Sequence, residues 1–242
     1  MSQNTPKPTE TRIQASMLAA VEKRCLIWMA ERMPTWVGSD HLTALGAVAT
    51  LAAGVCYWLG RTYPAALWLV VVFLILNWFG DSMDGTLARV RRQERPKYGF
   101  YIDHVLDVLS ILFLFAGLVA GGFMTPIIGA GFLLAYYLLT IEIALAAHTV
   151  GVFRISYWKM GPTEMRILLA AGTLQLLRSA EVSLFGHRYL LFDVGGVIAM
   201  VSLVATFLQA WISHTAILYK REPLRPRSPA PRNSQASVMI NA

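Results

Sequence analysis

Long apolar stretches separated by short polar connections make up most of the chain. Six of them approach or exceed the roughly 20 residues that an α-helix needs to cross a membrane. These stretches cover residues 42–60, 65–88, 99–121, 125–149, 164–180 and 190–218, and the fifth meets the criterion least well. The pattern predicts an all-α integral membrane protein with six transmembrane helices.

The two ends of the chain have other patterns. Between about residues 12 and 33, apolar and basic side chains mix as in an amphipathic helix on the anionic inner leaflet, with a plain solvated helix as the alternative. The tail from Glu222 is rich in Pro, Arg and Ser and cannot bury a core. We therefore expect an N-terminal tail with an amphipathic juxtamembrane helix (1–40), a six-helix domain (41–220) and a disordered basic tail (221–242).

Composition and charge agree with a membrane protein of defined orientation. The 242 residues are 56% hydrophobic and only 14% charged, which lies far from soluble averages. The six spans place 18 of the 21 Lys and Arg residues on one side, and the others are Arg61, Arg178 and Arg188. Because basic loops stay in the cytoplasm, we expect both termini to be cytoplasmic, in a multi-pass protein of a bacterial inner membrane. The net charge of +7 then reflects orientation, and no nucleic-acid partner is expected.

Four aspartates interrupt this apolar chain within 27 residues. They are Asp81, Asp84, Asp103 and Asp107. An ionised aspartate in hydrocarbon costs about 2.5–3.5 kcal/mol on insertion scales, so such a group needs a role such as holding cations or moving protons. The spacings i,i+3 and i,i+4 place each pair on one helix face, and a turn between two adjacent helices would bring the pairs together near the cytoplasmic surface.

The chemistry of these carboxylates favours a metal site for a phosphate-bearing substrate. Carboxylate oxygens suit one or two Mg²⁺ or Mn²⁺ ions, and Mg²⁺ keeps open positions for substrate phosphates. Gly85, Ala88 and Gly99 remove side-chain bulk beside the aspartates and would leave room for a headgroup, although ordinary helix packing explains any one glycine equally well. Arg89 could meet phosphate oxygens or extend to the membrane surface.

The complete pattern resembles the signature of the CDP-alcohol phosphotransferases, also called CDP-alcohol phosphatidyltransferases. That signature reads D-x2-D-G-x2-A-R, a spacer of eight or nine residues, then G-x3-D-x3-D. Every fixed position is present, namely Asp81, Asp84, Gly85, Ala88, Arg89, Gly99, Asp103 and Asp107. Six transmembrane helices with a juxtamembrane amphipathic helix are also typical of that family, so the resemblance extends over roughly residues 12–220.

The resemblance implies an enzyme that transfers a substituted phosphoryl group from a CDP-linked alcohol to a second alcohol and releases CMP. It implies that Asp81, Asp84 and Asp103 ligate two divalent metal ions and that Asp107 is a further ligand or the general base. Asp84, Gly85, Ala88, Arg89 and Gly99 would contact the CDP group. The resemblance also implies a homodimer.

The substrates are left open at this stage. The short six-helix chain favours CDP-diacylglycerol with a polar acceptor alcohol, which would make the product a phospholipid. The pairs Asp103-His104 and Thr163-Glu164 favour instead a soluble CDP-alcohol, as in choline and ethanolamine phosphotransferases that act on diacylglycerol. Candidate acceptor-binding residues follow the fourth span, namely Arg154, Lys159, Glu164 and Arg166. Thr163 and Glu164 could also simply begin a helix after Pro162.

Several other polar residues have two possible readings. The segment from Ser39 to Thr43 resembles a family segment that reads Pro-Asn-x-x-Thr, with Ser39 and Asp40 in place of Pro-Asn. Asp40 is then either a helix N-cap or a headgroup or nucleotide contact. His104 lies about 100° from Asp103 around a helix, which favours packing over metal ligation. Glu142, within a span, requires a partner.

Two other functions are compatible with acids in a membrane but fit the residues less well. A polyprenyl-diphosphate transferase would need a second aspartate motif in the other half of the chain, where none is found. A divalent-cation transporter would line its path with acids, but nothing in that function requires Gly85, Ala88, Arg89 and Gly99 at their positions.

Overall fold

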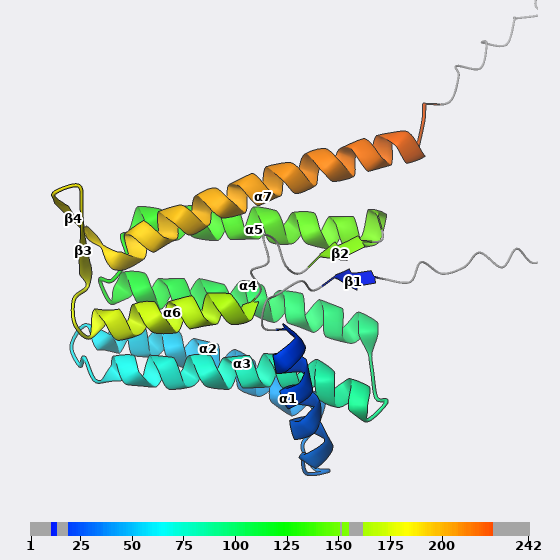
Figure 1. Ribbon diagram of the computed structural model, residues 1–242, viewed down its shortest axis with the longest axis horizontal. Helices are drawn as coiled ribbons and strands as arrows, with labels where there is room; N and C mark the ends of the chain where they lie inside the picture. Colours follow the sequence, from blue (N-terminus) through cyan, green and yellow to red (C-terminus); the bar gives the residue numbers. More distant parts are fainter. Residues whose placement is uncertain (1–10, 14–18, 151, 155–161, 225–242) are drawn as a thin grey trace, which may run out of the picture.

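The computed structural model describes residues 11–13, 19–150, 152–154 and 162–224, and these form a bundle of helices (Figure 1). The described residues contain seven helices and two sheets of two short strands. The helices are α1 (Ala19–Arg32), α2 (Ser39–Gly60), α3 (Ala66–Val90), α4 (Pro96–Ala120), α5 (Pro126–Thr149), α6 (Pro162–Leu176) and α7 (Leu191–Arg221). Strand β1 (Thr11–Ile13) pairs in parallel with β2 (Val152–Arg154), and β3 (Glu181–Leu184) forms a hairpin with β4 (His187–Leu190).

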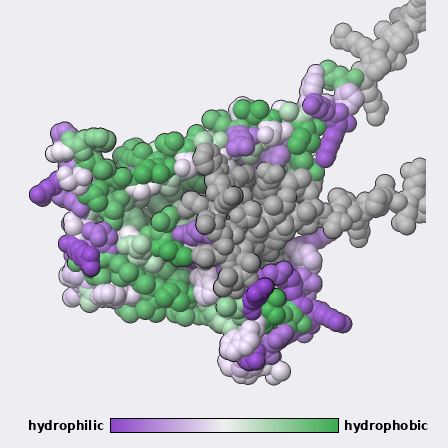
Figure 2. Space-filling model, in the orientation of Figure 1, coloured by the Kyte–Doolittle hydropathy of each residue, from purple (hydrophilic) through white to green (hydrophobic). Residues whose placement is uncertain are grey.

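Five of these helices are long and apolar enough to cross a membrane, namely α2, α3, α4, α5 and α7. Figure 2 shows hydrophobic residues along the bundle and hydrophilic residues mainly toward its ends. An all-α integral membrane protein is therefore confirmed. The predicted count of six spans is not confirmed, because α6 has 15 residues and reaches only about 22 Å. The chain beyond Leu176 forms the β3–β4 hairpin, and α6 still packs along α3.

Glycines bring the helices that carry the aspartates into close contact with α2. A Cβ atom at Gly80 of α3 would lie 2.6 Å from the backbone nitrogen of Gly46, and one at Gly117 of α4 would lie 2.0 Å from the carbonyl oxygen of Gly54. Real side chains cannot occupy such space, so these glycines permit backbone approach between neighbouring membrane helices. Helices α3 and α4 are thereby both held against α2.

Helix α1 runs across the bundle near the end of α3 (Figure 1). It begins at Ala19, so the predicted helix start at residue 12 is wrong: residues 11–13 form β1, and 14–18 lie outside the described residues. Leu26 and Ala30 are buried against Met83 and Leu87 of α3, whereas Trp28 is exposed. One apolar face of α1 therefore packs against α3, and the aromatic ring of Trp28 lies on a different, exposed face.

Helices α5 and α7 form a pair that is joined by two polar contacts. The carboxylate of Asp193 in α7 accepts hydrogen bonds from the amide and hydroxyl groups of Thr125, which precedes α5. Nearer the other end of the pair, Glu142 Oε1 lies 2.5 Å from His214 Nδ1. The partner that Glu142 requires is therefore a histidine on α7, and this pair is separate from the aspartates.

Candidate functional site

The last turns of α3 and the first turns of α4 carry the four aspartates to one small cavity. Its volume is about 20 Å³, which is close to the space of one water molecule. The cavity is lined by Thr43, Gly46, Ala47, Asn77, Asp81, Asp84, Asp103, Leu106, Asp107 and Ser110. The expected convergence of two carboxylate pairs from adjacent helices is present in the folded chain.

Asp84 is the most enclosed of the four, with 8% of its surface exposed. Thr43 Oγ1 donates a 2.7 Å hydrogen bond to Asp84 Oδ2, and the amide of Gly85 donates to Oδ1 at 2.5 Å. Ser39 Oγ donates to the backbone oxygen of Asp84 at 3.0 Å. The first turns of α2 therefore fix both the side chain and the backbone of Asp84.

Asp81 is held by a side chain from α6. Arg166 Nη2 donates to Asp81 Oδ2 at 2.6 Å, and Arg166 Nε donates to Asn77 Oδ1 at 2.7 Å. Asn77 Nδ2 in turn donates to the carbonyl oxygen of Gly46 at 3.0 Å. The Arg166 side chain is 17% exposed, so this ion pair is partly shielded from solvent. The structure thus places a predicted acceptor residue directly beside a predicted metal ligand.

Asp103 and Asp107 are less enclosed than Asp84. Both are exposed in the described chain, as is Asp81. Helix α4, which carries them, is held against α5 by a 3.1 Å hydrogen bond from the Tyr137 hydroxyl to the carbonyl oxygen of Val108. An incoming substrate would therefore meet Asp103 and Asp107 more readily than Asp84.

The donor chemistry of this cavity fits a divalent metal ion. Four carboxylates provide the hard oxygen ligands that Mg²⁺ and Mn²⁺ prefer. Among the described residues, however, no three His, Cys, Asp or Glu side chains are already grouped closely enough to hold an ion. The side chains would have to turn toward an ion for it to bind.

The small residues of the motif, Gly85, Ala88 and Gly99, do not line this cavity. Ala88 lines a second, larger cavity of about 290 Å³, at the junction of the start of α2, the end of α3 and the turn that follows. A Cβ atom at Gly99 would meet nothing within 4 Å. One at Gly85 would lie 3.3 Å from Arg89 Nη1, and Arg89 Nη2 donates to Thr86 Oγ1 at 3.1 Å. The larger cavity has space for a group larger than an ion, and it is connected to Asp84 through Ser39, which lines it.

Asp40 is not the N-cap of α2, so that reading of the sequence is wrong. Gly38 is the N-cap residue, and its amide donates to His41 Nδ1 at 3.0 Å. Asp40 lines the larger cavity, and its carboxylate pairs with Arg95, whose guanidinium group stacks on the Tyr98 ring. Helix α2 begins two residues earlier than an Asp40 cap requires, so Asp40 lies within its first turn.

His104 packs against its own helix, as its position predicted. Its Nδ1 donates to the carbonyl oxygen of Phe100 at 2.8 Å, and the two rings lie 4.1 Å apart.

The predicted acceptor residues are only partly described. The side chain of Arg154 and all of Lys159 lie outside the described residues. Glu164 lies in the first turn of α6, three residues after the last undescribed position. Arg166 is therefore the acceptor candidate that the structure places at the aspartate cavity.

Sequence reasoning missed two residues that contact this region, Thr43 and Glu22. A signal for Thr43 was available, because it occupies the threonine position of the segment that resembles Pro-Asn-x-x-Thr. Glu22 shares the face of α1 that carries Leu26 and Ala30, at spacings of four and eight residues. An acidic side chain on the apolar face of an amphipathic helix is the signal that would have marked it.

Comparison with known protein families gives a match. The model of a protein family described as CDP-alcohol phosphatidyltransferase matches residues 36–216. The matched region includes all four aspartates and extends from just before α2 into α7. No curated protein matches the chain.

Proposed function

The chain belongs to the CDP-alcohol phosphatidyltransferase family, and from this premise we propose that it transfers a phosphatidyl group from CDP-diacylglycerol to a polar acceptor alcohol with release of CMP. The family itself transfers a phosphoalcohol group from a CDP-alcohol. The observation that carries the proposal is the cavity on which Asp81, Asp84, Asp103 and Asp107 converge from two adjacent apolar helices.

Asp81, Asp84, Asp103 and Asp107 are the residues that would hold Mg²⁺ or Mn²⁺, with two ions expected. When bound, the metal ions would neutralise the diphosphate and stabilise the departing CMP. The enclosed Asp84, fixed by Thr43 and Gly85, supplies a rigid ligand. The exposed Asp107 can instead accept the proton of the attacking hydroxyl group, which requires an approach to about 2.6–3.2 Å.

The CDP group would lie across the small residues of the motif. Gly85, Ala88 and Gly99 leave room for it, and the larger cavity beside Ala88 has a volume suited to part of a nucleotide. Asp84 and Arg89 would contact the same group, Arg89 through its guanidinium donors to phosphate oxygens. This arrangement places the diphosphate between the larger cavity and the aspartates.

Arg166 is the residue of α6 best placed to recognise the acceptor, and Glu164 lies two residues before it. Arg154 and Lys159 remain candidates for the same role. The second candidate function is a phosphotransferase that moves phosphocholine or phosphoethanolamine to diacylglycerol, and the Thr163-Glu164 pair favours it. Both functions require a site that faces the cytoplasm, where CDP-alcohols are available. The charge distribution of the sequence predicts both termini of this multi-pass protein on the same side.

The proposal is tested by measuring CMP release by the purified protein in lipid nanodiscs. CDP-diacylglycerol is supplied with glycerol phosphate, inositol phosphate, inositol or serine, and CDP-choline or CDP-ethanolamine is supplied with diacylglycerol. We expect release with one donor class in Mg²⁺ and its loss in EDTA. Asp84→Ala and Asp107→Ala should abolish it while the protein elutes as wild type in size-exclusion chromatography.

The same preparation separates this function from transport. Uptake of a divalent ion into proteoliposomes, without CMP release from any donor, would refute a transferase and favour a transporter. Near-normal CMP release by Asp84→Ala or Asp107→Ala would show that the aspartate cavity is not the active site.

A further inference from the structure

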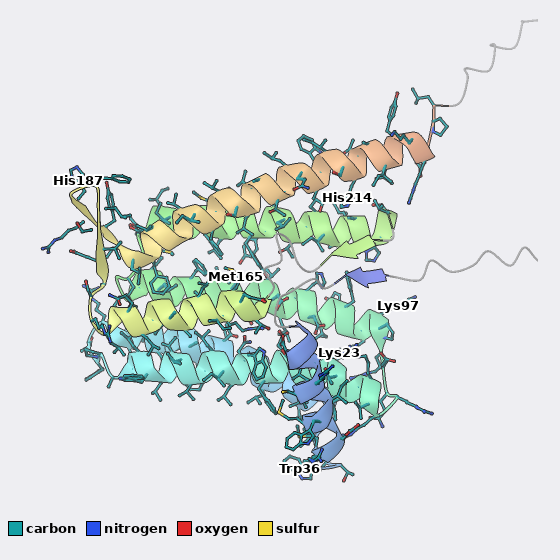
Figure 3. All side chains as sticks on the ribbon, viewed as in Figure 1. Lys23, Trp36, Lys97, Met165, His187 and His214 are labelled. Atoms are coloured by element: carbon teal, nitrogen blue, oxygen red, sulfur yellow. The ribbon has the colours of Figure 1, made fainter. Side chains whose placement is uncertain are left out.

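Glu22 of α1 accepts hydrogen bonds from two other helices at a single carboxylate oxygen. Trp78 Nε1 and Ser82 Oγ, both on α3, donate to Glu22 Oε1 at 2.9 and 3.3 Å. Thr163 Oγ1, in the first turn of α6, donates to the same oxygen at 3.0 Å. Hydrogen bonds to an ionised acceptor are stronger than neutral ones, so this oxygen joins three helices at one point. Figure 3 shows the start of α1 beside the first turns of α6, where Lys23 and Met165 are labelled.

The residues of α3 that bind Glu22 are sequence neighbours of those that bind Arg166. The α3 residues that bind Glu22 directly follow the two residues that bind Arg166: Trp78 follows Asn77, and Ser82 follows Asp81. On α6, Thr163 and Arg166 are three residues apart, a spacing that places them on neighbouring positions of one face. The first turn of α6 is therefore attached to α3 at two points, one through Glu22 and one at the aspartate cavity.

Contacts other than those of Glu22 also attach α1 to the bundle. Leu26 and Ala30 are buried against α3, and the guanidinium group of Arg91 donates to the carbonyl oxygens of Met33 and Val37 at 3.0 and 2.5 Å. These contacts hold α1 and the connection that follows it. The distinct contribution of Glu22 is its contact with α6: its carboxylate accepts the Thr163 hydrogen bond, while other contacts hold α1 in place.

We propose that Glu22 is a positioning residue, which holds the first turn of α6 so that Arg166 reaches the Asp81 side of the aspartate cavity. The effect of Glu22 on catalysis rests on the proposed function. If Arg166 recognises the acceptor, loosening α6 weakens acceptor binding and leaves the nucleotide side of the site, formed by α2, α3 and α4, in place. We therefore expect the KM for the acceptor to rise about ten-fold in Glu22→Ala while the KM for the CDP-linked donor stays within two-fold.

The test compares Glu22→Ala with matched variants in nanodiscs. Glu22→Gln keeps an oxygen acceptor at the same position, so its KM for the acceptor should stay close to that of the wild type. Thr163→Val removes only the α6 donor and should act like Glu22→Ala, whereas Thr163→Ser should behave as wild type. Lys23→Ala changes the neighbouring exposed residue of α1 and should have no effect on either KM.

Amide hydrogen exchange supplies a measurement that does not depend on activity. We expect faster exchange in residues 163–170 of Glu22→Ala and Thr163→Val, with wild-type exchange in α5 and α7. Unchanged exchange at 163–170 would overturn the proposal, as would faster exchange throughout the protein, which would mean a general role in folding. An equal rise in both KM values, or a local exchange effect without a change in acceptor KM, would also overturn it.

The two proposals can fail separately. If the wild-type protein releases no CMP with any donor and acceptor, the proposed function fails. Hydrogen exchange alone then decides whether Glu22 positions α6.

Discussion

Replacing Thr43 by valine tests whether the first turns of α2 hold Asp84 in its working position. Valine has nearly the shape of threonine, so the change removes the 2.7 Å hydrogen bond to Asp84 Oδ2 with little change in volume. Asp84 is 8% exposed, so solvent has little access to replace the lost donor. A hydrogen bond to a charged group contributes about 1.5–3 kcal/mol. If all of it serves to orient the carboxylate, kcat/KM falls roughly 10- to 150-fold.

The assay is CMP release in nanodiscs at saturating Mg²⁺ with the preferred donor. Thr43→Ser keeps the hydroxyl group and should retain most of the activity. Thr50→Val is the matched control, because Thr50 is a buried threonine of the same helix whose hydroxyl bonds only to the Gly46 carbonyl oxygen among the described contacts. Activity of Thr43→Val within two-fold of wild type, with Thr50→Val equally active, would refute the reasoning that this hydrogen bond orients Asp84.

Three further predictions concern packing and ion pairs, each measured as the thermal unfolding midpoint in detergent. Gly117→Ala should destabilise the protein by about 1–3 kcal/mol or more, because its Cβ would lie 2.0 Å from the Gly54 oxygen. In the control Gly195→Ala the new Cβ meets nothing within 4 Å, so this variant should be neutral or slightly stabilised. Equal unfolding midpoints of the two variants would contradict the close contact at Gly117. Glu142→Ala should cost about 1–3 kcal/mol, because the partly buried ring nitrogen of His214 loses its hydrogen-bond partner, and replacing both residues by leucine should cost less. A double variant that is less stable than Glu142→Ala would show that the pair itself stabilises α5 against α7. Asp40→Ala should change stability by less than about 1 kcal/mol, because both members of its pair with Arg95 are more than half exposed, and a larger loss would indicate a structural role for Asp40.

The helices that cross the membrane were predictable because their signal is local. Apolar stretches of sufficient length predicted α2, α3, α4, α5 and α7 to within a few residues at each end. The same criterion overestimated the stretch 164–180, because composition does not indicate that the chain leaves the helix at Leu176 to form a hairpin. It also placed the start of α1 too early, since a short apolar and basic segment can extend as a strand equally well.

The aspartate site was predictable for a different reason. The pairs Asp81-Asp84 and Asp103-Asp107 lie on two helices joined by a short turn, so local spacing alone brings them to the same end of the bundle. The conformation of each carboxylate was not predictable in this way. Asp84 is buried and Asp107 is exposed, although both occupy the second position of their pair.

By itself, the sequence determined the membrane class, most helix positions and the acidic residues that meet, because each depends on neighbours within about 27 residues. Only the tertiary structure decided the partners of those residues. The hydrogen-bonded partners are far apart in the sequence: Thr43 and Asp84 by 41 residues, Arg166 and Asp81 by 85, and Thr163 and Glu22 by 141. Such contacts depend on how each helix is rotated and how far it is displaced along its neighbour, and here close contacts at Gly46, Gly54, Gly80 and Gly117 fix that geometry for α2, α3 and α4.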